Sequence, residues 1–228
     1  MSGIVCFTFD DCDVKGWTAA IPLFATYDAH ALFSFSGAIT EEVIGCMKAL
    51  SVAGHSLGLH TVHHANAPEY MEEHGVHAYF DDEIAPQLDV CLAAGIKPGS
   101  FAFPNNRFND AALELLSPTF HHFRAGCGTM GGDAMFVKMK DLTPKCRVMR
   151  GGGLGEYYHT KTEDVLAAID RAADEDECLT FFSHGISEGA KGVNMPLALL
   201  TAALEHAKQR GCRMIGFDEL PKIGRAHV

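Results

Sequence analysis

Short apolar segments alternate with amphipathic segments along most of the chain, and this alternation restricts the fold more than any other feature. The apolar segments predict strands at 3–9, 30–36, 56–60, 99–104, 120–125, 145–149, 178–183 and 213–217. The amphipathic segments predict helices at 17–28, 40–53, 67–94, 109–116, 160–174 and 195–210. Strands that alternate with helices pair in parallel, and about seven or eight such units favour a closed or nearly closed α/β barrel. An open, doubly wound sheet is the alternative.

Composition favours a single globular domain over residues 1–228. Of the 228 residues, 47% are hydrophobic and 21% are charged, and no low-complexity tract or long linker divides the chain. The formal net charge of −11 argues against nucleic acid or an anionic membrane as the main partner. No apolar run reaches the ~18 residues expected of a membrane span. A neutral substrate such as a sugar or an amide is compatible with this charge.

Eight cysteines are scattered along the chain without a CxxC pair. Several lie inside apolar helix or strand patterns, and no secretory segment precedes the first predicted strand. We therefore expect reduced thiols and a cytoplasmic protein. Disulfides are the alternative for a chain that has been trimmed of a leader.

Residues 126–158 break the regular alternation. This segment is rich in glycine, with glycines at 126, 128, 131, 132, 151, 152, 153 and 155. We predict a long irregular segment, which either shapes a substrate pocket over the barrel or forms a mobile surface loop. The run at 151–155 is similar to a dinucleotide-binding turn, but the next predicted helix begins several residues too late, so we do not expect a nucleotide site.

Ionisable side chains follow the apolar strands at the ends that meet on one rim of a parallel barrel. Asp10 and Asp11 follow the first predicted strand, His60 and His64 lie at and beyond the third, and His184 follows a late strand. Two adjacent carboxylates repel each other, so a cation or a shared proton is expected to compensate them. One carboxylate with two imidazoles suits zinc or a similar divalent ion and leaves coordination positions open for water and substrate. The second carboxylate would then be free to act as a base.

Each of these groups also has a purely structural explanation. The two carboxylates could cap the helix before Trp17, and the two imidazoles could form a polar rim without a metal. His184 could be a buried histidine whose hydrogen bonds are satisfied. The shared position at strand ends, where barrel active sites form, favours the functional interpretation.

Five short motifs occur in an order and spacing that cover nearly the whole chain. They are TFDD at 8–11, GHSLGLHTVHH at 54–64, FAFP at 101–104, HGI at 184–186 and FDEL at 217–220. Together they resemble the motifs of the polysaccharide deacetylases with a NodB-homology domain, carbohydrate esterase family 4. The resemblance implies a distorted (β/α) barrel of about seven strands, related to the TIM barrel.

The resemblance also implies roles for the residues at the strand ends. Asp11, His60 and His64 would be the metal ligands, Asp10 the general base and His184 the general acid. A divalent ion lowers the pKa of a bound water and polarises an acyl carbonyl. A histidine can protonate a leaving amine near neutral pH, which an amide requires. Zinc (Zn²⁺) is the expected metal, with cobalt (Co²⁺) or another divalent ion as the alternative.

The chain departs from the family pattern at two places. Cys12 stands where the family usually has glycine, which could place a thiol near the metal. The arginine that the family often carries before its Pro-aromatic motif is absent. We therefore assign Arg124, on the following predicted strand, to orient Asp10 and balance its charge, with Arg107 as the alternative.

The expected activity is hydrolysis of a carbon–nitrogen bond other than a peptide bond. We expect a metal-dependent deacetylase that removes an acetyl group from an N-acetylated sugar or a similar amide, with Phe103, Pro104 and Asn105 contacting a small-molecule or oligosaccharide substrate. One alternative is a hydrolase of a small linear or cyclic amide on the same fold. The other is a non-catalytic carbohydrate-binding relative, and the retention of both Asp10 and His184 argues against it.

Overall fold

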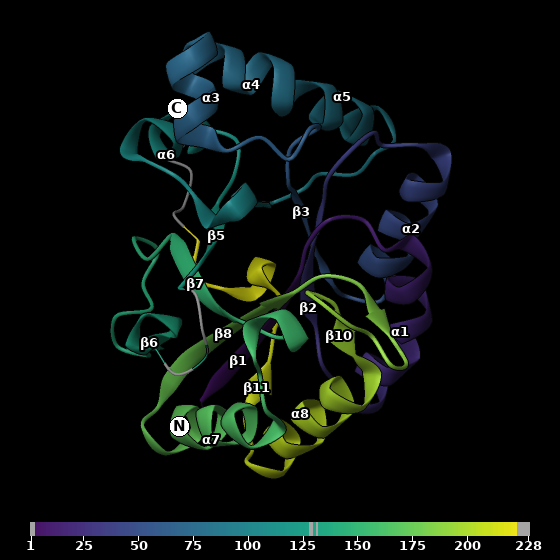
Figure 1. Cartoon of the computed structure of the whole chain (residues 1–228), viewed down its shortest axis with the longest axis vertical. Coiled ribbons are helices and arrows are strands. Elements are labelled where there is room, and N and C mark those ends of the chain that lie inside the picture. The colour runs from purple at the N-terminus through teal and green to yellow at the C-terminus, as the bar shows by residue number, and fades with distance from the viewer. Residues whose placement is uncertain (1–2, 128–129, 131, 223–228) are drawn as a thin grey trace.

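Seven parallel strands close into a barrel in the computed structural model, which describes residues 3–127, 130 and 132–222 (Figure 1). In order around the barrel they are β1 (Ile4–Phe9), β2 (Ala31–Phe35), β3 (Ser56–Leu59), β4 (Ser100–Ala102), β5 (His122–Gly126), β7 (Val148–Gly153) and β8 (Glu177–Ser183). The whole of β1 pairs with β8, from Ile4 opposite Cys178 to Phe9 opposite Ser183, and this pairing closes the sheet. The predicted distorted barrel is confirmed, and the open doubly wound sheet is wrong.

Four short strands complete the described sheets. β11 (Arg213–Met214) lies parallel to β1, and β6 (Phe136–Lys138) lies antiparallel to β8. β9 (Ile186–Ser187) and β10 (Met195–Pro196) pair only with each other. The sequence did not reveal β6, β9 or β10, because two or three residues are too few to show a strand periodicity.

Eight α-helices are described, and they surround the barrel (Figure 1). They are α1 (Val14–Thr26), α2 (Glu41–Val52), α3 (Ala67–His74), α4 (Val76–Glu83), α5 (Ala85–Ala93), α6 (Asp110–Leu116), α7 (Thr162–Asp174) and α8 (Leu197–Gln209). The prediction of one helix over 67–94 is wrong, since α3, α4 and α5 occupy this segment. The helical conformation is interrupted at Gly75, whose φ is 95°, and again at Ile84. Pro86 explains the second break, because proline lacks the N–H of a helical hydrogen bond and clashes with the preceding turn.

The first helix begins earlier than predicted and has a different cap. Asp13 is the N-cap of α1, and its Oδ1 accepts a hydrogen bond of 3.0 Å from the backbone N–H of Gly16. A side-chain oxygen at this position satisfies a backbone donor at the start of the helix. Asp10 and Asp11 therefore do not cap α1, and this structural alternative for the two carboxylates is wrong.

The glycine-rich segment 126–158 is more regular than predicted. Gly151 and Gly153 belong to β7, so the predicted strand at 145–149 begins three residues and ends four residues too early. A Cβ on Gly153 would lie 2.6 Å from the ring of Tyr158, and one on Gly151 would lie 3.2 Å from Phe182. The glycines therefore let aromatic rings pack directly against the strand backbone. Gly128 and Gly131, which also belong to the segment predicted to be irregular, lie outside the described residues.

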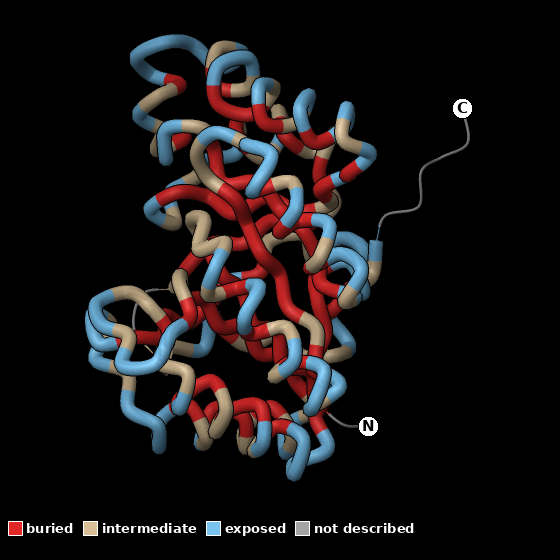
Figure 2. Tube along the Cα trace, turned by 90° about the vertical axis from the view of Figure 1, so that its right-hand side faces the viewer, coloured by how far each residue is buried: buried red, intermediate tan, exposed pale blue. Residues whose placement is uncertain are grey.

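Aromatic side chains fill the space between the sheet and α1. The rings of Phe9 and Phe33 stack with their centroids 5.2 Å apart, and Trp17 packs edge-on against Phe35 at 5.1 Å. Figure 2 shows the strands buried and the outer faces of the helices exposed. Strands covered on both sides in this way are almost entirely apolar, as in β1, where Thr8 is the one polar residue. Among the described residues, no helix is both long and apolar enough to cross a membrane.

Candidate metal centre

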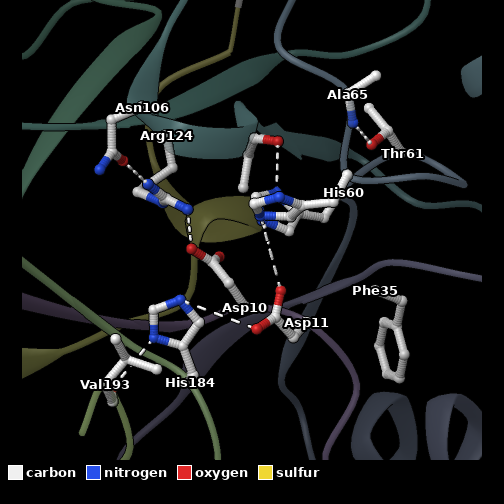
Figure 3. A network of polar contacts seen from close by, with 12 residues as sticks. Asp10, Asp11, Phe35, His60, Thr61, Ala65, Asn106, Arg124, His184 and Val193 are labelled. Atoms are coloured by element: carbon white, nitrogen blue, oxygen red, sulfur yellow. Dashed lines mark hydrogen bonds and ion pairs between the residues drawn. The ribbon is translucent and has the colours of Figure 1, made fainter.

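Asp11, His60 and His64 come together at the carboxyl-terminal rim of the barrel. Asp11 follows β1, and His60 directly follows β3, so parallel pairing brings both to the same end of the sheet. The donor atoms of the three side chains all lie within 4.8 Å of one another. Nε2 of His60 lies 3.8 Å, and Nε2 of His64 lies 3.9 Å, from Oδ1 of Asp11. Figure 3 shows Asp11 facing His60 across this gap.

The three donors fit a divalent cation. His60 is buried, and its Nδ1 donates a hydrogen bond of 2.8 Å to the carbonyl oxygen of Ala102, which leaves Nε2 free. Burial lowers the pKa of His60 to about 4, so the lone pair of the neutral imidazole is available at neutral pH. Separations of 3.8 and 3.9 Å are too long for hydrogen bonds and leave room for an ion bound at about 2.0–2.2 Å from each donor.

The backbone is left-handed at several residues of this centre. The φ angles are 77° at Asp11, 66° at Thr61 and 56° at His64. Such conformations cost about 1–3 kcal/mol each in residues other than glycine and persist only where surrounding contacts hold them. The carbonyl oxygen of Asp11 accepts a hydrogen bond of 2.8 Å from the backbone N–H of Ser36. Oγ1 of Thr61 accepts one of 3.0 Å from the backbone N–H of Ala65 (Figure 3).

Asp10 is paired with an arginine from the opposite side of the barrel. Oδ2 of Asp10 accepts a hydrogen bond from Nη2 of Arg124, which lies in β5, and Oδ1 of Asn106 accepts one from Nη1 (Figure 3). Burial lowers the pKa of Arg124 to about 9, which still leaves the guanidinium charged at neutral pH. Arg107, the other arginine considered for this role, is exposed. Arg124 is therefore the cation that compensates Asp10.

His184 approaches the centre from β8. Its Nε2 lies 3.9 Å from Oδ2 of Asp11, and its Nδ1 lies 3.1 Å from the carbonyl oxygen of Val193 (Figure 3). Its own carbonyl oxygen accepts a hydrogen bond of 3.0 Å from Nε1 of Trp17. Burial lowers the pKa of His184, and the negative charge of Asp11 opposes this shift. An Nδ1–H that donates to Val193 leaves Nε2 directed at the centre.

Comparison with known families identifies the chain. The family model described as polysaccharide deacetylase matches residues 2–119, half of the chain. The chain belongs to the polysaccharide deacetylase family. No curated protein matches it in sequence.

Solved structures of polysaccharide deacetylases share the barrel. A family 4 carbohydrate esterase from Streptococcus mutans is 21% identical, with a TM-score of 0.63 over 94% of this chain and 86% of that chain. A peptidoglycan deacetylase from Bacillus subtilis is 14% identical, with a TM-score of 0.60 over 96% and 89%. A family 4 carbohydrate esterase from Streptomyces lividans, solved in complex with acetate, is 16% identical, with a TM-score of 0.57 over 91% and 87%. At these identities the similarity shows the fold.

In this member of the polysaccharide deacetylase family, the candidate residues line a cavity of about 500 Å³. Of the three residues predicted to contact substrate, Phe103 and Asn105 lie in its wall, whereas Pro104 is buried and is not among the residues that line it. Sequence reasoning missed five further residues of the wall, which are Asn106, Tyr157, Tyr158, Phe182 and Val193. Only the two adjacent tyrosines after the glycines at 151–155 could have indicated these residues from the sequence. A tyrosine ring that packs on a glycine, as that of Tyr158 does on Gly153, is held close to the strand.

Cys12 does not join the candidate ligands in this family member. It lies in the wall of a second cavity of about 530 Å³, which shares Asp10, Asp11 and His184 with the first. Burial raises the pKa of Cys12 to about 11, so its sulfur is a thiol at neutral pH. Among the described residues, the donors that lie within 4.8 Å of one another are those of Asp11, His60 and His64, and Cys12 is not one of them.

Proposed function

We propose that this polysaccharide deacetylase family member is a metal-dependent hydrolase that removes an acetyl group from an N-acetylated sugar or a similar amide. One observation carries the proposal: the donor atoms of Asp11, His60 and His64 lie within 4.8 Å of one another, beside a buried Asp10–Arg124 pair. A metal-binding set next to a held carboxylate is the arrangement that water-mediated acyl hydrolysis requires. We propose that residues 1–228 act as one catalytic domain, because these residues come from strands of one barrel.

Asp11, His60 and His64 would hold the divalent ion. Zinc is proposed because two imidazoles and one carboxylate match its preferred ligands, with cobalt or another divalent ion as a substitute. When bound, the ion would supply a water of lowered pKa and a positive charge for the oxygen of the acyl carbonyl. Asp11 and His64 are about half exposed, so substrate and solvent can reach the donors.

Asp10 is proposed as the general base. Its carboxylate is buried, and Arg124 balances its charge, so it can stay ionised without solvent. Oδ1 of Asp10 has no hydrogen-bond partner among the described residues and is available to take a proton from the attacking water. Asn106 holds the second terminal nitrogen of Arg124 and thereby fixes the direction of the guanidinium.

His184 is proposed as the general acid. Its Nε2 is directed at the centre, where protonated imidazole can give its proton to the nitrogen of the leaving amine. The products are acetate and a free amine, so water supplies the oxygen and the hydrogens that the broken bond requires. Phe103 and Asn105, in the cavity wall, are proposed to contact the sugar or amide, and the buried Pro104 between them in the sequence is proposed to support them.

The test is release of acetate by the metal-loaded protein from N-acetylated sugar oligomers, together with turnover of a chromogenic acetyl ester. Asp10→Asn preserves the shape of the side chain and removes the base, so turnover of both is expected to fall to background. A carbohydrate-binding relative would bind the oligomers equally well in both forms and release no acetate from either. That second pattern would overturn the proposed function.

A further inference from the structure

We propose that Gln87 is a positioning residue for the metal ligands, an inference that rests on the ligand assignment made above. Gln87 lies on α5, outside the barrel, and is buried. Its Nε2 donates to three backbone carbonyl oxygens: 2.8 Å to Gly37, 3.1 Å to Phe35 and 3.2 Å to Thr61. Phe35 and Gly37 lie at and after the end of β2, and Thr61 lies after β3. One side chain therefore joins the two segments that surround the ligands.

Each of these segments is hydrogen-bonded to a ligand. On the β2 side, the backbone N–H of Ser36 donates 2.8 Å to the carbonyl oxygen of Asp11. The carbonyl oxygen of Phe35, which Gln87 also contacts, accepts a hydrogen bond of 2.8 Å from the backbone N–H of His60. The amide of Gln87 thus shares an acceptor with His60 and lies one residue away from Ser36, the backbone contact of Asp11.

The conformation at Thr61 explains why such an anchor is needed. Thr61 is β-branched and has a φ of 66°, a region that β-branched residues rarely enter. It directly follows His60, and His64 at the end of the same turn is also left-handed. Such a turn persists only where contacts outside it hold it. Besides Gln87, the N–H of Gly37 holds the carbonyl oxygen of Thr61, at 3.1 Å.

Glu83, at the end of α4, provides a second anchor for the same turn. It is buried, and its Oε2 accepts a hydrogen bond of 2.8 Å from the backbone N–H of His63. Its backbone carbonyl accepts one of 3.1 Å from the N–H of Val62. The break between α4 and α5 places Glu83 and Gln87 on separate helices that both face this turn. The two anchors together hold residues 61–63.

Replacement by methionine isolates the contribution of the amide. Methionine has a similar length but no donor, and the amide must present its nitrogen, because its oxygen cannot face three carbonyl oxygens. Gln87→Met is therefore expected to weaken metal binding by about 10–100-fold, the range typical of contacts that orient ligands. Gln209→Met is the matched control, since Gln209 is exposed at the end of α8, and it is expected to leave the affinity unchanged.

The readout is the dissociation constant of Zn²⁺, measured by competition with a chelator in the absence of substrate. The absorption spectrum of the Co²⁺-loaded protein reports ligand geometry in the same variants, and we expect it to change in Gln87→Met. Leu204→Ala separates a positioning role from a general loss of stability. Leu204 is buried on α8, so this variant lowers the denaturant midpoint while it keeps the wild-type metal affinity. If Gln87→Met does not fold, Gln87→Asn replaces it in the test. Asparagine is one methylene shorter, so its amide no longer reaches the three carbonyl oxygens, and the same loss of metal affinity is expected.

Wild-type metal affinity in the Gln87 variants would overturn the inference, and so would an equal loss of affinity in Leu204→Ala. Metal affinity is measured without substrate, so it tests the role of Gln87 even if the protein deacetylates no sugar. Wild-type protein that binds no ion would overturn the ligand assignment and this inference together.

Discussion

Arg124 donates a hydrogen bond from Nη2 to Oδ2 of Asp10, so the carboxylate that follows β1 is held by a guanidinium from β5. The two side chains are 1% and 2% exposed. Water solvates both charges poorly at this depth, so each ion depends on the other. The pair keeps Asp10 charged beside Asp11, which is the condition for Asp10 to act as a base.

The first prediction concerns the loss of this pair. Arg124→Met leaves a buried carboxylate without a cation, which is expected to lower the free energy of unfolding by about 3–5 kcal/mol. Urea unfolding at pH 7 measures the change. Arg107→Met removes an exposed arginine nearby in sequence and is expected to change the free energy by no more than about 0.5 kcal/mol. A loss in Arg124→Met as small as that of the control would contradict the pairing.

A double-mutant cycle tests the same contact independently. Adding Asp10→Asn to Arg124→Met removes the unpaired charge, so the double variant is expected to be more stable than Arg124→Met alone. Losses that simply add would mean that the two side chains are not coupled.

The second prediction tests the role of His184 as the acid that protonates the leaving group. His184→Ala is expected to slow hydrolysis of an N-acetylated amine by about 10²–10⁴-fold, because the leaving nitrogen needs a proton. Hydrolysis of an acetyl ester of 4-nitrophenol is expected to fall much less, since the phenolate leaves without one. His77→Ala, at an exposed position of α4, serves as the control. Equal losses on the two substrates would exclude an acid role for His184.

The third prediction uses the glycines of β7. Alanine at Gly153 would place a Cβ 2.6 Å from the ring of Tyr158, which is expected to destabilise the fold by about 1–3 kcal/mol and raise KM as the ring moves into the cavity. Gly45→Ala in α2 meets nothing within 4 Å and is expected to stabilise by about 0.5–1 kcal/mol. Thermal unfolding and steady-state kinetics measure both variants. Wild-type KM in Gly153→Ala would show that Tyr158 does not shape the substrate site.

The fourth prediction is a pH dependence of stability. Nδ1 of His55 accepts a hydrogen bond of 3.1 Å from the backbone N–H of Ala31, and burial lowers the pKa of His55 to about 4. In the unfolded chain its pKa is about 6.5, so the unfolded state gains a proton first as the pH falls. The contribution of His55 is therefore complete above about pH 6.5 and is lost as the pH falls toward 4.

Asparagine at position 55 keeps an acceptor for the N–H of Ala31 but cannot titrate in this range. Between pH 7 and pH 5 the wild type is expected to lose about 2 kcal/mol more stability than His55→Asn. Guanidinium unfolding at the two pH values measures the difference. The absolute stabilities differ for other reasons, so only the two pH slopes are compared, and equal slopes would show that His55 does not titrate as described.

The sequence predicts the candidate residues well at the ends of strands. Asp11, His60 and His184 each follow a short apolar run, and parallel pairing places the carboxyl ends of such runs on one rim. The positions in space then follow from the topology, with no knowledge of side-chain contacts. Their roles in chemistry remain predictions that the variants above are designed to test.

Segments whose regularity depends on tertiary contacts could not be predicted in the same way. The apolar pattern of 67–94 continues through Gly75 and Pro86, and only the local backbone breaks reveal three helices. Gly151 and Gly153 have low intrinsic strand propensity, yet they lie in β7, because the rings of Phe182 and Tyr158 occupy the space that larger side chains would fill.

Residues that act through distant contacts were also hidden. Gln87 lies in a helix pattern in which nothing distinguishes it from an ordinary polar position, and its three acceptors come from segments 26 to 52 residues away. Tyr157 and Tyr158 enter the cavity wall from a short 3₁₀ helix after β7. Only the fold brings these side chains to the site.

Metal binding by single-ligand variants tests the central claim most directly. Titration of the metal-free protein with Zn²⁺ is expected to give a single ion per chain in the wild type. His60→Ala and Asp11→Ala are each expected to weaken that binding by more than about 10-fold, while His74→Ala, at an exposed position of α3, leaves it unchanged. Wild-type affinity in both ligand variants, or no bound ion in the wild type, would contradict the account.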